Sequence, residues 1–223
     1  MEEQMFNVVR SQSAPASLAT ERLKSSGEYN KPDVLECLKQ DFYNKCYLCE
    51  EKAISKIEVD HFLPHLNGTH LDRKFDWGNL FFCCGHCNGT KGSNQDTLLD
   101  CTSANDDVYN SLRYDFVSFP KEAVNISVAN TNDKSENTAK LLNQIYSGKD
   151  PTNLTNRVME AGNIREKIRQ EIDKFDDLLL AEKDELTLAK IKYAVSKKSP
   201  FSAFKRQVIK DNARLQYLVN LFD

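Results

Sequence analysis

The sequence predicts an α+β protein with a small zinc-stapled core of two strands and a helix, followed by a β-hairpin and an appended α-helical C-terminal region. Two Cys-x-x-Cys pairs, Cys46/Cys49 and Cys84/Cys87, bracket two strand-type apolar runs. Two later runs alternate between apolar and polar residues, and the rest of the chain is apolar at helical spacing. The cysteine pairs predict a metal site. The alternating periodicity predicts the hairpin, and the helical periodicity predicts the helices.

The composition is that of an ordinary globular chain without a strong charge bias. Its 223 residues suffice for one large domain or for a small domain with an appended one. A net charge of −3 and a pI of about 5.9 argue against a protein that coats nucleic acid by bulk electrostatics. If the chain binds nucleic acid, we expect it to use a local patch or the basic surface of a partner.

The chain is expected to be cytoplasmic and to have no membrane partner. No apolar run approaches the roughly 20 residues of a membrane span, and the first residues lack the apolar centre of a signal peptide. The cysteine count of seven is odd, and four of the cysteines lie in Cys-x-x-Cys pairs. In a reducing compartment this pattern indicates metal binding and not a disulfide framework.

Four cysteines are the predicted ligands of one structural Zn²⁺: Cys46, Cys49, Cys84 and Cys87. Two thiolates separated by two residues can close on one ion from a tight turn, and two such pairs complete a tetrahedron. His86 lies between two of these ligands and is expected to point outward, although it could substitute as a ligand. Cys83 competes with its neighbour but breaks the two-residue gap, and we expect it to be a buried apolar residue.

The elements before the first cysteine pair are an arm and a helix. Residues 1–30 are small, polar and turn-prone, which predicts an extended N-terminal arm that is poorly ordered or docks on a partner chain. The zinc-stapled domain is predicted to span residues 31–103. It should contain a helix over 32–44, strands over 56–60 and 79–83, and a short helix that opens at Cys84.

Two further regions complete the predicted organisation. Residues 104–135 should form a hairpin with strands over 114–119 and 124–128, followed by a polar connector over 130–137. Residues 136–223 should form a helical C-terminal domain. Its predicted helices lie around 141–146, 158–179 and 186–194, with a last helix from Ser199 through Leu221.

Five residues between and just after the cysteine pairs carry the candidate chemistry. A neutral histidine such as His61 can take a proton from water near pH 7. Asp60 and Asn88 offer the oxygen ligands that a hard cation such as Mg²⁺ prefers. Asn79 could hold the His61 loop through its amide. Lys91, one helical turn after Asn88, is placed to meet a phosphate as a point charge. Together these residue types suit hydrolysis of a phosphodiester.

At these residues the sequence resembles the HNH nucleases of the ββα-metal fold. The matching elements are Cys46/Cys49, Asp60-His61-Phe62-Leu63-Pro64, Asn79-Leu80, and Cys84/Cys87 with Asn88-Gly89-Thr90-Lys91. The resemblance implies that residues 31–103 form an HNH nuclease domain with a structural four-cysteine zinc. It implies that His61 is the general base, that Asp60 and Asn88 bind the catalytic divalent cation (Mg²⁺ or Mn²⁺), and that Asn79 orients His61.

Within that family, the first half of the chain is similar to the HNH nucleases of Septu-type anti-phage systems, which also occur as effectors of some retrons. The segments that carry this resemblance are 14–18, 42–50, 60–65, 76–81 and 98–101. It implies a partner ATPase of the ABC/SMC-like type and a nuclease that is held in check until infection. A retron reverse transcriptase with its RNA–DNA is a further partner that it implies.

The alternative function is a non-catalytic zinc-ribbon-type module that binds nucleic acid or protein. The combination of Asp60-His61 with Asn88 favours the nuclease, because a binding module needs no base beside a metal-binding pair. The sequence leaves open whether the substrate is DNA or RNA, including tRNA.

Overall fold

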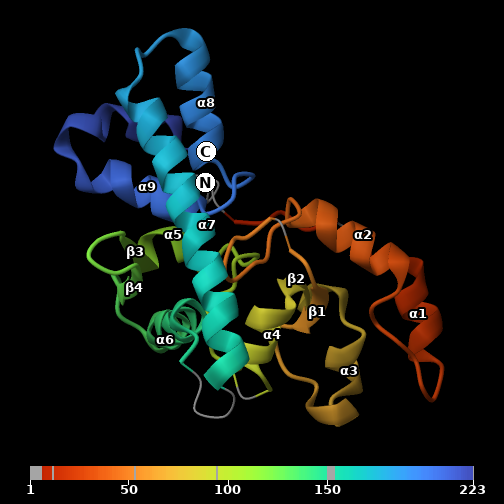
Figure 1. Cartoon of the computed structure of the whole chain (residues 1–223). Coiled ribbons are helices and arrows are strands. Elements are labelled where there is room, and N and C mark those ends of the chain that lie inside the picture. Colours follow the sequence, from red (N-terminus) through yellow and green to blue (C-terminus); the bar gives the residue numbers. More distant parts are fainter. Residues whose placement is uncertain (1–6, 12, 53, 94, 150–153, 223) are drawn as a thin grey trace.

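The computed structural model describes residues 7–11, 13–52, 54–93, 95–149 and 154–222 (Figure 1). They form a mixed α+β fold with two small antiparallel sheets. Within this part of the chain, none of the helices combines the length and the apolarity of a membrane span. Residues 1–6 and 12 of the expected arm lie outside the described residues.

The first sheet and two helices form the region that carries the cysteine pairs. Its elements are α2 (Pro32–Asp41), β1 (Ile57–His61), β2 (Leu80–Cys84) and α4 (Gly85–Lys91). Strands β1 and β2 are antiparallel, with Ile57 opposite Cys84 and His61 opposite Leu80. Every residue of β2 is buried, so the strand lies inside the core. The two predicted strands and the short helix are thus present, each within a residue of its expected start.

The predicted helix over 32–44 ends earlier than expected, at Asp41. Pro32 occupies the first turn, where its missing N–H has no intrahelical partner to lose. Tyr43 and Asn44 have φ angles of 55° and 58°, which no right-handed helix allows. The chain therefore leaves α2 in a left-handed turn that leads directly into the first cysteine pair.

The loop between β1 and β2 contains short helical segments that the sequence did not predict. They are a 3₁₀ turn at Leu66–Gly68, helix α3 (Leu71–Lys74) and a 3₁₀ turn at Trp77–Asn79. The indole of Trp77 is buried, in agreement with the core-packing expected of a tryptophan at the entry to a strand.

The expectation of an extended arm is wrong for residues 16–22, whereas residues 7–11 and 13–15 have no regular secondary structure. Residues Ala16–Arg22 form helix α1, and Leu18 is buried. The guanidinium of Arg10 lies 4.3 Å from the centre of the Trp77 ring and donates hydrogen bonds of 2.8 Å to the carbonyls of Trp77 and Leu80. It also pairs with Asp41 at 3.2 Å. The contacts of Arg10 and the burial of Leu18 therefore hold this polar N-terminal segment against the rest of the chain.

The predicted hairpin is present, but its first strand begins and ends two residues earlier than expected. It consists of β3 (Leu112–Val117) and β4 (Ala123–Val128), preceded by the short helix α5 (Val108–Ser111). The expected connector over 130–137 is wrong from residue 133, where α6 (Asp133–Ser147) begins. Asn132 and Ser135 form a reciprocal capping box there, so the polar residues start a helix instead of linking two elements.

The C-terminal region is helical, as predicted. It contains α7 (Leu154–Leu180), α8 (Glu185–Val195) and α9 (Ser202–Asp211). The expected single last helix is interrupted at Asn212, and a 3₁₀ helix follows over Ala213–Leu221. Asn212 has an extended backbone and caps the new segment with its side chain, which explains the break.

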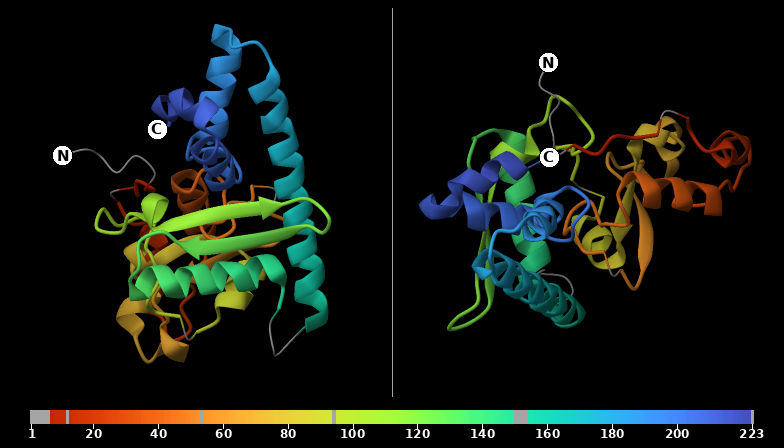
Figure 2. Two further views of the ribbon diagram at one scale, coloured as in Figure 1. Left: turned by 90° about the vertical axis from the view of Figure 1, so that its left-hand side faces the viewer. Right: turned by 90° about the horizontal axis from the view of Figure 1, so that it is seen from above.

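Helix α7 connects two hydrophobic clusters. At one end it contacts α6, and at the other it packs against α8 and α9 (Figures 1 and 2). The left view of Figure 2 shows the β3–β4 ribbon between α6 on one side and the C-terminal helices on the other. The larger cluster joins the two sheets with α6, and the smaller one surrounds Phe175, Ile191 and Ile209.

Candidate functional site

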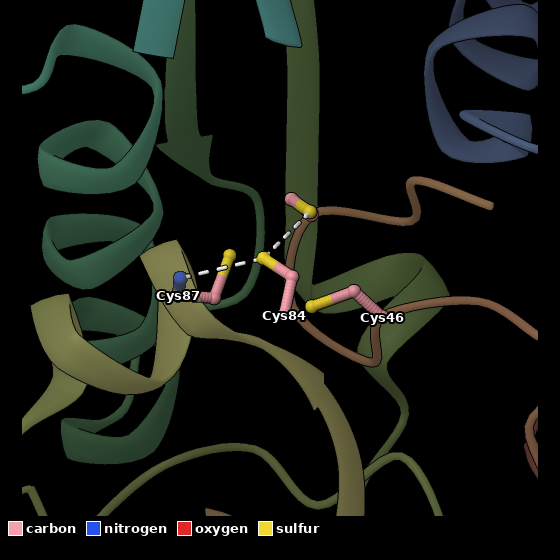
Figure 3. Close-up of side chains that lie close together, drawn as sticks. Cys46, Cys84 and Cys87 are labelled. Atoms are coloured by element: carbon pink, nitrogen blue, oxygen red, sulfur yellow. Dashed lines mark hydrogen bonds between the residues drawn. The ribbon is translucent and has the colours of Figure 1, made fainter. Parts of the chain in front are cut away.

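The structure brings the four predicted zinc ligands together in the core. The Sγ atoms of Cys46, Cys49, Cys84 and Cys87 lie within 4.8 Å of one another, and all four residues are buried. Figure 3 shows the sulfur atoms of Cys46, Cys84 and Cys87 gathered where β2 meets α4. The Sγ atoms of Cys49 and Cys84 are 3.9 Å apart. A tetrahedral zinc–thiolate site with bonds of about 2.3 Å has edges of about 3.8 Å. The cluster could therefore hold a zinc ion.

The two competing ligands occupy other positions. Cys83 is buried with its Sγ atom 3.8 Å from that of Cys46, but it lies outside the group of four. The expectation that His86 points outward is wrong. Its ring is buried between α6 and α7, with Nδ1 2.9 Å from Glu160 Oε2 and Nε2 2.9 Å from the Ile145 carbonyl. His86 therefore connects helix α4, which carries Cys87, to α6 and α7.

A separate pocket of about 280 Å³ collects three of the predicted catalytic residues. Asp60, His61 and Asn88 line it, together with Tyr29 and His65 from the flanking loops. Strand β1 supplies the first two residues and helix α4 supplies the third, because the antiparallel pairing of β1 and β2 carries the chain back to α4 beside β1. We call this the His61 pocket.

His61 is held as a neutral imidazole with one nitrogen available. Its Nε2 atom lies 3.1 Å from the carbonyl oxygen of Lys74. A carbonyl only accepts hydrogen bonds, so Nε2 carries the proton and Nδ1 keeps a lone pair. Burial lowers the pKa of His61 to about 4, with the Lys74 carbonyl acting in the opposite direction. The rings of Tyr29 and His65, with centres 4.3 and 4.4 Å away, fix its orientation.

Asn79 contacts the backbone of the loop that follows His61. Its Oδ1 atom accepts from the Leu63 N–H at 2.7 Å, and its Nδ2 atom donates to the carbonyls of Leu63 and Arg73 at 2.9 and 3.0 Å. Arg73 directly precedes Lys74, whose carbonyl accepts the hydrogen bond from His61 Nε2. The amide of Asn79 thereby joins both ends of the loop that carries the partner of His61.

Asp60 is buried and has two donors. The hydroxyl of Tyr47 donates to Oδ2 at 2.5 Å, and Lys91 Nζ lies 3.1 Å from the same oxygen. Burial raises the pKa of Asp60, and both donors act in the opposite direction. Tyr47 is a residue that the sequence did not single out. The sequence signal that could have identified it was its position between Cys46 and Cys49, because the turn that carries these cysteines brings its hydroxyl to Asp60 on β1.

Lys91 does not lie where a phosphate contact was expected. Its side chain is buried, and Nζ donates to the carbonyl of His61 at 2.7 Å in addition to its ion pair with Asp60. Helix α4 turns this lysine inward, toward β1, because Asn88 and Lys91 lie one helical turn apart on the face that covers the strand.

Replacing Lys91 with methionine is expected to destabilise the zinc-loaded protein by about 3–5 kcal/mol, because the change leaves Asp60 buried without its cation. Urea unfolding measures the loss. The double variant with Asp60→Asn should recover part of it, and Lys121→Met, at an exposed lysine, should be neutral. A loss below about 1 kcal/mol would contradict a buried ion pair.

Asn88 is oriented by a second residue that the sequence did not single out. Its Nδ2 atom donates to Glu58 Oε2 at 2.6 Å, so Oδ1 is the remaining acceptor of the amide. Glu58 lies two residues before Asp60, on the same face of β1. The two-residue periodicity of a strand could have identified Glu58 from the sequence, because it places Glu58 on the same face as Asp60.

One structural unit therefore contains the antiparallel β1–β2 sheet, helix α4 and the four-cysteine cluster. The Asp60-His61 pair lies at the end of its first strand. Over 91 aligned residues the chain is 32% identical to the Septu protein PtuB of Bacillus thuringiensis. The similarity covers 36% of this chain and 35% of that protein, so the chain spans about a third of the curated relative's length. This partial similarity supports a PtuB-like relationship. No protein-family model matches the chain.

Proposed function

We propose that the chain is a metal-dependent HNH endonuclease that hydrolyses phosphodiester bonds in nucleic acid. The main support is the composition of the His61 pocket. A neutral imidazole with an available Nδ1 atom lines the same pocket as the carboxylate of Asp60 and the amide of Asn88. A base beside two oxygen donors suits hydrolysis and serves no purpose in a binding module.

In the proposed reaction, His61 Nδ1 accepts the proton of the attacking water. Asp60 and Asn88 would hold the divalent cation, Mg²⁺ or Mn²⁺, since both offer the oxygen donors that hard cations prefer and both line the pocket. Such a cation, when bound, neutralises charge on the phosphate and the leaving oxygen. Tyr47 and Lys91 hold the carboxylate of Asp60 in place, and Glu58 does the same for the amide of Asn88. The four cysteines would hold a structural zinc.

We further propose that the nuclease is the effector of a bacterial anti-phage complex in the cytoplasm. The partial similarity to a Septu protein supports this role. Its partner would be an ABC/SMC-like ATPase, and in a retron setting a reverse transcriptase with its RNA–DNA. The partner would also supply the basic surface that a chain of net charge −3 lacks. On this proposal, residues 31–103 are the nuclease domain and residues 136–223 the helical domain that contacts the partner or the substrate.

The cation requirement tests the proposed activity. Labelled DNA and RNA, including tRNA, are incubated with the zinc-loaded chain, alone and co-purified with the products of its neighbouring genes. We expect cleavage only after Mg²⁺ or Mn²⁺ is added, at unchanged zinc content. Retention of nucleic acid without products at any cation concentration, in both preparations, would instead identify a zinc-dependent binding module.

A further inference from the structure

Tyr29 brings a hydroxyl to the His61 pocket from outside the unit formed by β1, β2 and α4. It lies in the segment 23–31, which connects α1 to α2. Its ring contacts the His61 ring edge-on, with centres 4.3 Å apart and planes at 71°. The side chain is half-buried, and within the part of the chain that the structure describes its hydroxyl has no hydrogen-bond partner. A donor of this kind on a pocket wall is free to bind a ligand.

The segment that carries Tyr29 is fixed relative to His61. Lys74 Nζ donates to the carbonyl of Gly27 at 2.8 Å. An added Cβ at Gly27 would lie 1.9 Å from the carbonyl oxygen of Glu21, so this close approach of two backbone segments requires glycine. The backbone carbonyl of Lys74 accepts from His61 Nε2. One residue thus holds both the segment and the imidazole, and the two rings are positioned before a substrate binds.

The His61 pocket offers a phosphate few charged partners. Among the described residues that line it, none is a lysine or an arginine, and Asp60 adds a negative charge. The proposed cation would neutralise part of the charge of a phosphodiester, and the remaining stabilisation has to come from neutral donors. Burial, and then the carboxylates of Glu58 and Asp60, raise the pKa of Tyr29, so its hydroxyl keeps its proton at neutral pH.

The position of the hydroxyl favours contact with the phosphate that reacts. Tyr29 belongs to the lining of the pocket and its ring touches that of His61. A phosphate close enough to be attacked by a water on His61 Nδ1 is therefore within reach of this hydroxyl. When the water attacks, negative charge increases on the non-bridging oxygens, and a hydrogen bond to one of them becomes stronger.

We propose that the Tyr29 hydroxyl donates a hydrogen bond to a non-bridging oxygen of the phosphate that is cleaved. The inference rests on the proposed nuclease function of the same pocket. It makes Tyr29 a substrate-binding residue, which the segment 23–31 adds to a pocket otherwise lined by residues between 59 and 93. The proposed nuclease domain over 31–103 would then need the preceding segment for full activity.

Tyr29→Phe tests the proposal, because it removes the hydroxyl and keeps the ring against His61. The zinc-loaded full chain, co-purified with the products of its neighbouring genes, is used. We expect the single-turnover rate of cleavage to fall about tenfold to a hundredfold, the loss typical of a hydrogen bond to a charged group. Zinc content and melting temperature should not change. Tyr217→Phe, at an exposed tyrosine outside the pocket, should cleave like the unmodified chain.

Sulfur substitution distinguishes contact with the phosphate from an effect on His61. The substrates carry one phosphorothioate of defined configuration at the mapped cleavage position, and Mn²⁺ is the cation, because it is softer than Mg²⁺ and accepts sulfur more readily. Sulfur is a weak hydrogen-bond acceptor. For one diastereomer the effect of Tyr29→Phe should therefore shrink to that of Tyr217→Phe, and for the other it should stay as large as for the oxygen substrate.

The results separate failure of this inference from failure of the proposed function. If Tyr29→Phe cleaves as fast as the unmodified chain, the inference is overturned and the nuclease proposal stands. Equal slowing of both diastereomers also overturns it, because the hydroxyl would then act through His61 and not on the phosphate. If the unmodified preparation cleaves nothing at any concentration of Mg²⁺ or Mn²⁺, the nuclease proposal itself is wrong and the inference falls with it.

Discussion

Replacing His61 with alanine is expected to lower the rate of nucleic-acid cleavage by about a hundredfold to ten-thousandfold, the range typical of a lost general base. The structure gives the reason. The imidazole is neutral, Nε2 is bound to the Lys74 carbonyl, and Nδ1 is the atom left to accept a proton. Alanine keeps the strand and removes the acceptor. The measurement is nucleic-acid integrity, for both DNA and small RNA, in cells that express the chain with its neighbouring genes under phage challenge.

His65→Ala is the matched control for this prediction. His65 lines the same pocket, and its ring centre is 4.4 Å from that of His61, but it belongs to the loop and is more exposed. Its loss should reduce cleavage much less. If His61→Ala cleaves and protects like the unmodified chain, His61 is not the base. If only His65→Ala is inactive, the base is the neighbouring ring. Equal melting temperatures of the two variants would show that the difference is chemical.

Replacing Cys84 with serine is expected to abolish zinc binding and to unfold the unit formed by β1, β2 and α4. Structural zinc contributes about 10–16 kcal/mol to the folding of small zinc-dependent units, and this unit has only two short strands and a seven-residue helix around the four cysteines. Cys84 ends β2 and caps α4, because its Sγ atom accepts from the Cys87 N–H at 3.4 Å. One substitution therefore removes a ligand and a helix cap together.

Zinc content per chain and the thermal unfolding midpoint measure the effect of Cys84→Ser. Cys83→Ala is a sharp control, because it changes the adjacent buried thiol, which lies 3.8 Å from Cys46 Sγ but outside the group of four. It should retain one zinc per chain. Cys37→Ser, at a half-buried thiol away from the cluster, should also retain it. Full zinc content in Cys84→Ser, or its loss in Cys83→Ala, would show that the ligand set is different.

The features that depended on short-range spacing could be predicted from the sequence. The two Cys-x-x-Cys pairs indicated the cluster because a tight turn alone brings two thiols to one ion. Alternating polarity indicated the β3–β4 hairpin, and helical periodicity indicated the C-terminal helices. Polarity without periodicity was misleading. Because these segments are polar and show no clear periodicity, the sequence predicts part of an arm in place of α1, and part of a connector in place of the first turn of α6.

By itself, the sequence determined which residue types are available for metal binding and proton transfer, and in what order they occur. Only the tertiary structure decided how they are used. It turned Lys91 inward onto Asp60, joined Tyr47 to the same carboxylate, and enclosed His86 between α6 and α7. These contacts connect residues that are from 13 to 74 positions apart in the chain. Periodicity within one element gives the direction of a side chain relative to that element, but the partner that it meets depends on how separate elements pack.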